Sequence, residues 1–240
     1  MSRAFDGMAK VRYNDRVKSP LQILGRGLVL LALCATPAMA APDAPDAPAA
    51  QALPPPPPSY ADAPEMRRLL HWDHFPLHVY FTPGDLATKE HMDAVQAGMD
   101  QWAHATKNFV SYQVVTKPAQ AEVLVTFLPH DSVPDQGGSC GHTTITFLTL
   151  TLKSASMSLA TTGVAPLDLQ AAAAHEFGHA LGIDGHSDDP EDLMYAVVCH
   201  SPDGDLPLPA HTVTARDLNT LRICYPAFAA PPAAVPKSSH

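Results

Sequence analysis

Several segments of the chain alternate hydrophobic and polar residues with a period of two, which is the pattern of half-buried β-strands. Residues 76–81 alternate in this way and lead into a Pro-Gly turn. Residues 109–115 and 122–128 are two further strand candidates. Residues 143–152 alternate threonine with Ile, Phe and Leu, which fits one long strand or two short ones. These segments together predict a β-sheet.

Two longer segments are expected to form helices. In residues 87–106 the apolar positions recur at spacings of three and four, which indicates an amphipathic helix. These positions are Met92, Val95, Met99, Trp102 and Ala103. The second helix is expected to begin at Pro166, a favourable first helical position, and to run through the alanine-rich residues 169–181. Gly182 then stands where a left-handed residue ends a helix.

A last short helix is expected near the C-terminus. The segment from Thr214 to Asp217 resembles a capping box in which Asp replaces the usual Glu, and the helix should close the domain near Tyr225. The order of strand, helix, strands and helix predicts a mixed sheet with helices packed on it. A chain of 240 residues can bury one sizeable core but is short for two enzyme-sized domains.

The N-terminal residues have the order of a secretory signal, with a basic region, a short apolar run and a small-residue cleavage site. The apolar run covers residues 28–33, and the pattern Ala-Met-Ala ends at Ala40. A membrane anchor is the alternative, but the run is far shorter than the roughly 20 residues that span a bilayer. We expect residues 1–40 to be cleaved, the mature protein to be secreted or periplasmic, and no stable membrane insertion to remain. Translation from Met8 and a lipoprotein at Cys34 are weaker alternatives.

Composition sets the expected domain boundaries. Residues 41–64 are rich in Pro and Ala, which cannot build a core, and predict an extended linker. Residues 227–240 return to this composition and are expected to be a disordered tail. The folded domain should therefore span residues 65–226.

The charge of the chain excludes one class of partner. It contains 15 Lys and Arg against 24 Asp and Glu, and loss of residues 1–40 removes six basic and two acidic residues. The mature chain would then carry a formal charge of −13. A protein this acidic is not expected to bind nucleic acid by neutralising phosphates.

The cysteines predict one disulfide. Three remain after residue 40, namely Cys140, Cys199 and Cys224, which is an odd number for an oxidising compartment. One bridge and one free thiol is the simplest arrangement. We favour pairing of Cys199 with Cys224, and the other two pairings stay open.

Residues 175–186 read HEFGHALGIDGH and carry the candidate metal ligands. His175 and His179 are four residues apart on the predicted helix, so both imidazoles can reach one small cation. Gly182 ends the helix and lets His186 approach from outside it. Three histidines that leave a fourth position for water are the pattern of a catalytic zinc site, and we expect one such Zn²⁺.

Glu176 follows the first of these histidines and is expected to face the water rather than the metal. It is the candidate catalytic residue, because it can take a proton from water that attacks a peptide carbonyl and pass that proton to the leaving amine. The HExxH pentapeptide alone occurs by chance in helices. The glycine and histidine downstream, the alanine-rich helix and Met194 make the combination specific. No other cofactor-binding residue is predicted.

The segment HEFGHALGIDGHS resembles the zinc signature of the metzincins and is most similar to the matrixin branch, in which serine commonly follows the third histidine. Residues 189–195 are similar to the segment that leads into the Met-turn of bacterial matrixin-like proteins, and residues 214–221 resemble their last helix. The resemblance implies an α+β, metzincin-like fold. Such a fold has a twisted mixed β-sheet, two long helices and a small, mainly irregular C-terminal subdomain that ends in a helix. It also implies that Met194 forms a hydrophobic floor beneath the metal.

The chain departs from the family's usual spacing by one residue. The pattern HExxHxxGxxH would place the third ligand at Gly185, which has no side chain. We predict that the turn absorbs an extra residue and that His186 is the ligand, with Asp184 as the alternative. Tyr195 directly follows Met194, one position before the metal-binding tyrosine of some other metzincins, so we expect it to pack rather than to bind metal.

A loose group of polar residues lies before residue 143. It consists of His130, Asp131, Asp135, Cys140 and His142. Matrixins often hold a second zinc ion or calcium nearby, but no spacing here is diagnostic, and we interpret the group as a polar surface loop. The acidic residues of 188–192 could bind calcium, but no loop pattern supports this, and we expect them to be solvated charge. Residues 41–76 contain no cysteine, so the sequence does not support latency through a propeptide cysteine on the zinc.

These features together predict a secreted zinc endopeptidase that acts on protein or peptide substrates as a monomer. The alternative is a noncatalytic zinc-binding or adhesion module that keeps the fold. The presence of Glu176 argues against this alternative, because a binding module needs no base beside the metal.

Overall fold

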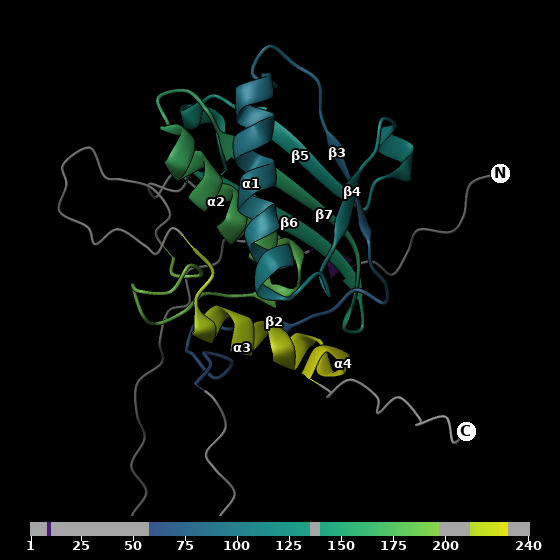
Figure 1. The fold of residues 1–240 in the computed structure, drawn as a ribbon, viewed down its shortest axis with the longest axis vertical. Coiled ribbons are helices and arrows are strands. Elements are labelled where there is room, and N and C mark those ends of the chain that lie inside the picture. Colours follow the sequence, from purple (N-terminus) through teal and green to yellow (C-terminus); the bar gives the residue numbers. More distant parts are fainter. Residues whose placement is uncertain (1–8, 11–57, 135–139, 197–211, 230–240) are drawn as a thin grey trace, which may run out of the picture. The chain divides into compact units, whose positions relative to one another are not determined.

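The structure is a computed structural model that describes residues 9–10, 58–134, 140–196 and 212–229. A mixed β-sheet forms its centre, with the strand order β1-β6-β7-β5-β3-β4 (Figure 1). The strands are β1 (Ala9–Lys10), β3 (Leu77–Phe81), β4 (Tyr112–Val114), β5 (Val123–Leu128), β6 (Gly141–Leu148) and β7 (Thr151–Ala160). Strands β3, β4, β5 and β7 are parallel, whereas β6 runs antiparallel to β7 and to β1.

The strands agree with the alternating patterns in most places. Side chains in β5 alternate strictly between buried and partly buried, as expected for its position between two neighbours. The segment 109–115 pairs only over β4, because Lys107 and Asn108 make a turn with φ of 54° and 63° and Phe109 then packs among other aromatic rings. Residues 143–152 belong to two strands separated by a turn at Thr149, which has φ of 59°.

The sequence did not predict residues 153–160, which make up most of β7. This part of the strand is rich in small polar residues that have weak strand preference. It pairs with β5 on one side and β6 on the other, and buries Met157 and Leu159. Tertiary pairing therefore outweighs the local preference.

Two long helices, α1 (Lys89–Ala105) and α2 (Pro166–Ala180), pack against each other on one side of the sheet (Figure 1). The axes approach closely at Gly98 of α1, where a Cβ atom would overlap the carbonyl of Gln170. Trp102 of α1 donates its indole hydrogen to the Ala174 carbonyl of α2 at 2.7 Å. Both helices begin within two residues of the predicted starts, and Thr88 caps α1.

Two short helices, α3 (Ala215–Cys224) and α4 (Pro226–Ala229), lie below the sheet in Figure 1. The predicted capping box at the start of α3 is confirmed, since Thr214 and Asp217 bond to each other's backbone amides. Helix α4 extends past residue 226, where composition suggested a tail. It is held there by Phe228, whose ring stacks on Phe109 with centroids 5.0 Å apart. Two single-turn 3-10 helices, η1 (Pro118–Gln120) and η2 (His130–Ser132), lie in the loops.

Residues 58–70, which we name the N-terminal strap, run along the lower part of the domain. Composition suggested a linker up to residue 64, yet Tyr60 is only 1% exposed and donates its hydroxyl to Asp217 at 2.8 Å. The strap ends in β2 (Arg68–Leu69), which pairs antiparallel with β8 (Ile183–Asp184) in a second, two-stranded sheet. The folded part of the chain thus begins before residue 65.

The favoured cysteine pairing is wrong. Cys140 is disulfide-bonded, whereas Cys224 is free and buried on the inner side of α3. The sulfur of Cys224 lies 3.9 Å from the Gly182 carbonyl, inside the core rather than near a surface loop. Cys199 lies outside the described residues.

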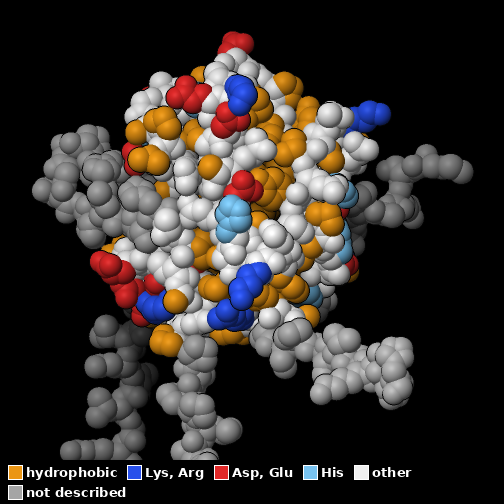
Figure 2. All heavy atoms as spheres, viewed as in Figure 1, with side chains coloured by type: hydrophobic (Ala, Val, Ile, Leu, Met, Phe, Trp, Pro, Cys, Tyr) orange, Lys and Arg blue, Asp and Glu red, His pale blue; other side chains and the backbone are white. Residues whose placement is uncertain are grey.

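The face of the molecule drawn in Figure 2 carries charges of both signs. Figure 2 shows acidic and basic side chains scattered among apolar and neutral ones, with no continuous basic patch on this face of the described residues. Within the same residues, no helix combines the length and apolar character that crossing a membrane requires.

Candidate metal centre

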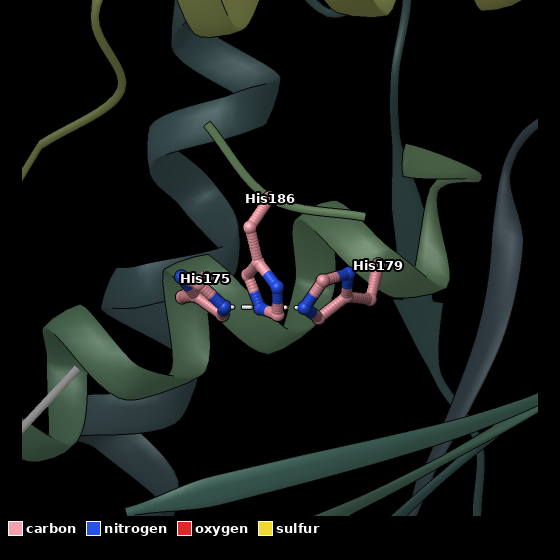
Figure 3. Close-up of side chains that lie close together, drawn as sticks. All are labelled: His175, His179 and His186. Atoms are coloured by element: carbon pink, nitrogen blue, oxygen red, sulfur yellow. Dashed lines mark hydrogen bonds between the residues drawn. The ribbon is translucent and has the colours of Figure 1, made fainter. Parts of the chain in front are cut away.

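His175 and His179 project from the C-terminal half of α2 toward one point (Figure 3). The spacing of four residues places them one helical turn apart. Their ring centroids are 4.8 Å apart, and their Nε2 atoms are 3.1 Å apart. The two imidazoles thus share one face of the helix, as their spacing predicts.

His186 reaches the same point from outside the helix. Gly182 leaves α2 with φ of +113°, β8 carries the chain along the strap, and Gly185 turns it again with φ of +157°. The ring of His186 lies 5.3 Å from that of His175 and 5.0 Å from that of His179, measured between centroids. One ligand nitrogen from each ring lies within 4.8 Å of the other two. The turn therefore absorbs the extra residue by forming a short strand between two glycines.

Asp184, the alternative third ligand, does not join this cluster. Its Oδ2 atom lies 3.4 Å from the guanidinium of Arg68, across the β2–β8 pair. Burial raises the pKa of Asp184, and the positive charges of Arg68 and Arg67 oppose that shift. Among the described residues, the one group of side chains that could hold a metal consists of the three histidines.

The outer nitrogens of two rings contact backbone carbonyls. His175 Nδ1 lies 2.8 Å from the Leu193 carbonyl. His179 Nδ1 lies 2.7 Å from the Ile183 carbonyl. A carbonyl only accepts, so each Nδ1 carries the hydrogen and each Nε2 presents a lone pair to the other. Two lone pairs at 3.1 Å repel each other unless a cation binds both. Zinc fits, because Zn–N bonds of about 2.0–2.1 Å at tetrahedral angles separate two ligand nitrogens by about 3.3 Å.

Burial keeps the three imidazoles neutral. It lowers the pKa of His175 to about 3 and that of His179 to about 4. The pKa of His186 is also lowered, first by burial and then by the neighbouring histidines. Neutral imidazole is the form that binds zinc, so the lone pairs are available at neutral pH.

Glu176 is buried beside the first histidine and is held by β6. Thr143 of this strand donates its hydroxyl to Glu176 Oε2 at 2.6 Å. Gly141, at the start of the strand, leaves room for the carboxylate, since a Cβ atom there would lie 2.6 Å from Glu176 Oε1. Burial raises the pKa of Glu176 to about 8, and the hydrogen bond from Thr143 opposes this shift.

Met194 is fully buried and packs against α2. The contact falls at Gly178, one residue before His179, where a Cβ atom would overlap the sulfur of Met194. The missing side chain at Gly178 lets the methionine approach the helix between the two histidines. The role of Met194 as a hydrophobic floor beneath the metal stays a prediction.

Asp217 of α3 holds the two consecutive backbone amides of Leu193 and Met194. Its carboxylate accepts from the backbone amides of Leu193 at 3.1 Å and Met194 at 3.2 Å. Tyr60 and Thr214 donate to the same carboxylate. Burial raises the pKa of Asp217, while the hydrogen bonds from Thr214 and Tyr60 oppose that shift. The sequence identified Asp217 only as a cap of α3.

Three acidic residues that follow His186 pair with one arginine of α3. The guanidinium of Arg216 lies 2.9 Å from Asp188, 3.3 Å from Asp189 and 2.8 Å from Asp192. Asp192 also accepts from the hydroxyl of Thr214. The expectation of solvated charge is wrong for Asp192, whose side chain is 4% exposed, whereas Asp188 and Asp189 remain exposed to solvent while they pair with Arg216.

The weaker candidates do not form part of the three-histidine group. His130 and Asp131 lie in η2 and His142 lies in β6, and none of them joins a potential metal site within the described ranges. Asp135 lies outside those ranges. Cys140 is disulfide-bonded and so offers no thiolate to the metal. Tyr195 is half-buried and forms a backbone bridge with Ser187.

The sequence around this site matches a known family. A sequence model of the matrixin peptidases matches residues 72–217, which is more than half of the chain. The chain belongs to the matrixin family. Matrixins are zinc-dependent endopeptidases that act on proteins or peptides, and the match includes all three histidines and the Met-turn. A search of curated proteins finds no match.

Three contributors to this matrixin's site escaped the sequence analysis. Thr143 and Gly141 belong to a strand whose pattern indicated only pairing, and nothing local showed that they face Glu176. Glu65 lies 3.6 Å from His186 Nδ1, measured from its Oε2 atom. Glu65 precedes the zinc motif by more than a hundred residues, so no spacing rule could connect the two.

Proposed function

We propose that this matrixin is an extracytoplasmic endopeptidase in which His175, His179 and His186 hold one catalytic zinc ion. The observation that carries the proposal is the convergence of three neutral imidazoles on one point, with two Nε2 lone pairs 3.1 Å apart. Three protein ligands that leave a fourth coordination position for water are typical of catalytic rather than structural zinc.

When bound, zinc supplies a Lewis acid that polarises the peptide carbonyl and lowers the pKa of a bound water. We assign the proton transfers to Glu176, because the positive charge of a bound zinc ion would favour its carboxylate form against the burial that raises its pKa. Its Oε2 atom is held by the hydroxyl of Thr143, so its Oε1 atom takes the proton from the attacking water. The same oxygen then delivers that proton to the amide nitrogen of the leaving group. Thr143 keeps the carboxylate in one orientation during both transfers.

Strand β6 is the surface that we assign to the substrate backbone. Its outer edge pairs with β1, which has only two residues. Cleavage after Ala40 would remove β1 and expose the amides and carbonyls of β6, which an extended peptide can pair with as an added strand. Because Thr143 of β6 bonds to Glu176, such a peptide would pass close to the general base.

Two independent features support an extracytoplasmic location. The first is the signal-like order of residues 1–40. The second is the disulfide at Cys140, since structural disulfides persist in oxidising compartments. Expression of the full chain in an exporting bacterial host should yield a protein outside the cytoplasm that begins at Ala41. Recovery of an uncleaved chain only from the cytoplasm would contradict this assignment.

The proposal is tested by Glu176→Gln, which keeps the size of the side chain but cannot accept the proton. We expect cleavage of an unfolded protein substrate to fall by about 10²–10⁴-fold, the usual contribution of a general base. Zinc content should remain near one ion per chain. The exposed Glu90 of α1 provides the matched control, and Glu90→Gln should retain full activity.

Two outcomes would count against the proposal. Equal cleavage by Glu176→Gln and the wild type would remove Glu176 from the mechanism. A wild-type protein that binds zinc but cleaves no substrate, with or without a chelator, would favour the noncatalytic module instead.

A further inference from the structure

The three zinc-site histidines differ in what contacts their outer nitrogens. His175 and His179 each direct Nδ1 to a backbone carbonyl, at 2.8 Å and 2.7 Å. The Nδ1 atom of His186 instead lies 3.6 Å from the carboxylate of Glu65. A backbone carbonyl remains when the side chain of its residue is substituted. The carboxylate near His186 is lost when Glu65 is substituted. Of these three contacts, the one to His186 is therefore the one that a side-chain substitution removes directly.

Backbone hydrogen bonds hold Glu65 in place. The residue after it, Met66, donates to the Ala63 carbonyl at 2.9 Å and closes a turn within the strap. Arg67 then donates to the Asp184 carbonyl at 2.9 Å. The main chain of Glu65 is thus positioned on both sides by bonds that do not involve its own side chain. Changing that side chain should leave the path of the strap intact.

The strap and the extended zinc turn also fit closely together. A Cβ atom at Gly185 would lie 2.5 Å from the Glu65 carbonyl, and one at Gly182 would overlap the Leu70 carbonyl. The backbone of the strap therefore lies directly against the turn that carries His186. The lengthened turn contains the two-residue strand β8, and β8 pairs with β2 of the strap. This contact places the carboxylate of Glu65 beside His186.

We propose that Glu65 is a positioning residue for His186. Its Oε2 atom lies 3.6 Å from Nδ1, just beyond hydrogen-bond length, and a small shift of this exposed side chain lets the carboxylate accept the Nδ1 hydrogen and hold Nε2 toward the nitrogens of the other two rings. This inference rests on the proposed zinc site. Carboxylate partners of ligand histidines fix the ring and its tautomer, and their loss commonly weakens metal binding about 10–100-fold. The side chain of Glu65 is 61% exposed, so we expect an effect at the lower end of that range.

The test is the zinc affinity of the metal-free protein, measured by competition with a chelating dye. Glu65→Ala and Glu65→Met both remove the acceptor oxygens, and Met preserves the length of the side chain if Ala loosens the strap. Glu65→Gln retains one acceptor oxygen without the charge. Asp62 is an exposed acid of the same strap, so Asp62→Ala is the matched control for loss of a carboxylate.

We expect Glu65→Ala and Glu65→Met to raise the zinc Kd about tenfold. Glu65→Gln should stay within about threefold of the wild type, and Asp62→Ala should bind zinc as the wild type does. The melting temperature of the metal-free Glu65→Met protein should match that of the wild type. A positioning role thus predicts lost affinity without lost folding.

The outcomes separate this inference from the proposed function. An unchanged zinc Kd in both Glu65→Ala and Glu65→Met, in a protein that still cleaves substrate, would overturn the role of Glu65 alone. Affinity lost equally in Glu65→Gln and Glu65→Met would also overturn it, because the acceptor oxygen would then not matter. A wild-type protein that binds no zinc would overturn the proposed function itself.

Discussion

The candidate metal centre has two halves that the chain assembles in different ways. The helix half lies within a single helix and consists of His175, Glu176 and His179. The assembled half draws on segments that are far apart in the sequence. It consists of His186, the turn 182–186, the N-terminal strap, Met194 and Asp217. The first half depends on helical geometry, and the second depends on contacts between segments.

This difference indicates which substitutions should disturb the metal centre. The helix half is positioned by hydrogen bonds within α2, so few distant side chains can disturb it. The assembled half relies on pairs such as Tyr60 with Asp217, which are 157 residues apart, and Arg68 with Asp184, which are 116 apart. Substitutions remote from the zinc should therefore affect the assembled half more than the helix half.

Removal of the Asp217 carboxylate should have the largest effect. Asp217→Ala leaves the buried amides of Leu193 and Met194 and the hydroxyl of Tyr60 without their acceptor. Each unpaired buried donor costs about 1–3 kcal/mol, so we expect the free energy of unfolding to fall by about 3–5 kcal/mol. Urea unfolding of the metal-free protein measures this change.

Asp168 offers the matched control in the helix half. It lies in the first turn of α2, where Asp168→Ala should cost only about 0.3–1 kcal/mol through the helix dipole. Equal losses of stability in the two variants would remove the proposed contrast between the halves.

Substitution of the third ligand should have the next largest effect. His186→Ala should weaken zinc binding by more than about 100-fold, beyond the usual effect of losing an outer partner. Asp184→Asn should leave zinc binding within about threefold of the wild type, because Asp184 contacts Arg68 rather than the cluster. Zinc competition titrations compare the two variants directly. A larger loss in Asp184→Asn would reverse our assignment of the ligand.

A methyl group at Gly178 tests the contact between the halves. Gly178→Ala favours the helix by up to about 1 kcal/mol but overlaps the sulfur of Met194 and crowds Trp102. We expect overpacking to prevail, with a net loss of about 1–2 kcal/mol in the free energy of unfolding. Gly84 has no atom within 4 Å of its ideal Cβ position, so Gly84→Ala should change stability by less than about 0.5 kcal/mol. Stabilisation by Gly178→Ala would show that Met194 can move without cost.

Loss of the Thr143 hydroxyl should have the smallest effect. Thr143→Val removes the hydrogen bond to Glu176 while it preserves the shape of the side chain. We expect kcat to fall by about tenfold, since a hydrogen bond to a charged group contributes about 1.5–3 kcal/mol and water can replace part of it. Thr143→Ser should restore most of the activity, and KM should change little in either variant. A change in KM alone would assign Thr143 to substrate binding.

Local patterns predicted most of the secondary structure. The strand at 76–81, the helix at 87–106 and the helix that begins at Pro166 all form close to their expected bounds. Their periods reflect burial on one face, which each segment specifies by itself. Residues 153–160 of β7 and the β2–β8 pair were missed, because their pairing depends on neighbours rather than on their own residue preferences.

The candidate metal centre also has a part that local sequence predicts and a part that only tertiary contacts determine. The sequence alone was enough to bring His175, Glu176 and His179 together and to predict the turn at Gly182, because an α-helix fixes the relative positions of residues three and four apart. Tertiary structure decided that His186 rather than Asp184 joins the cluster, that Glu65 lies beside His186, and that Cys224 remains free. These outcomes depend on which distant segments touch. A buried polar group needs a partner, but the local sequence does not say which part of the chain supplies it.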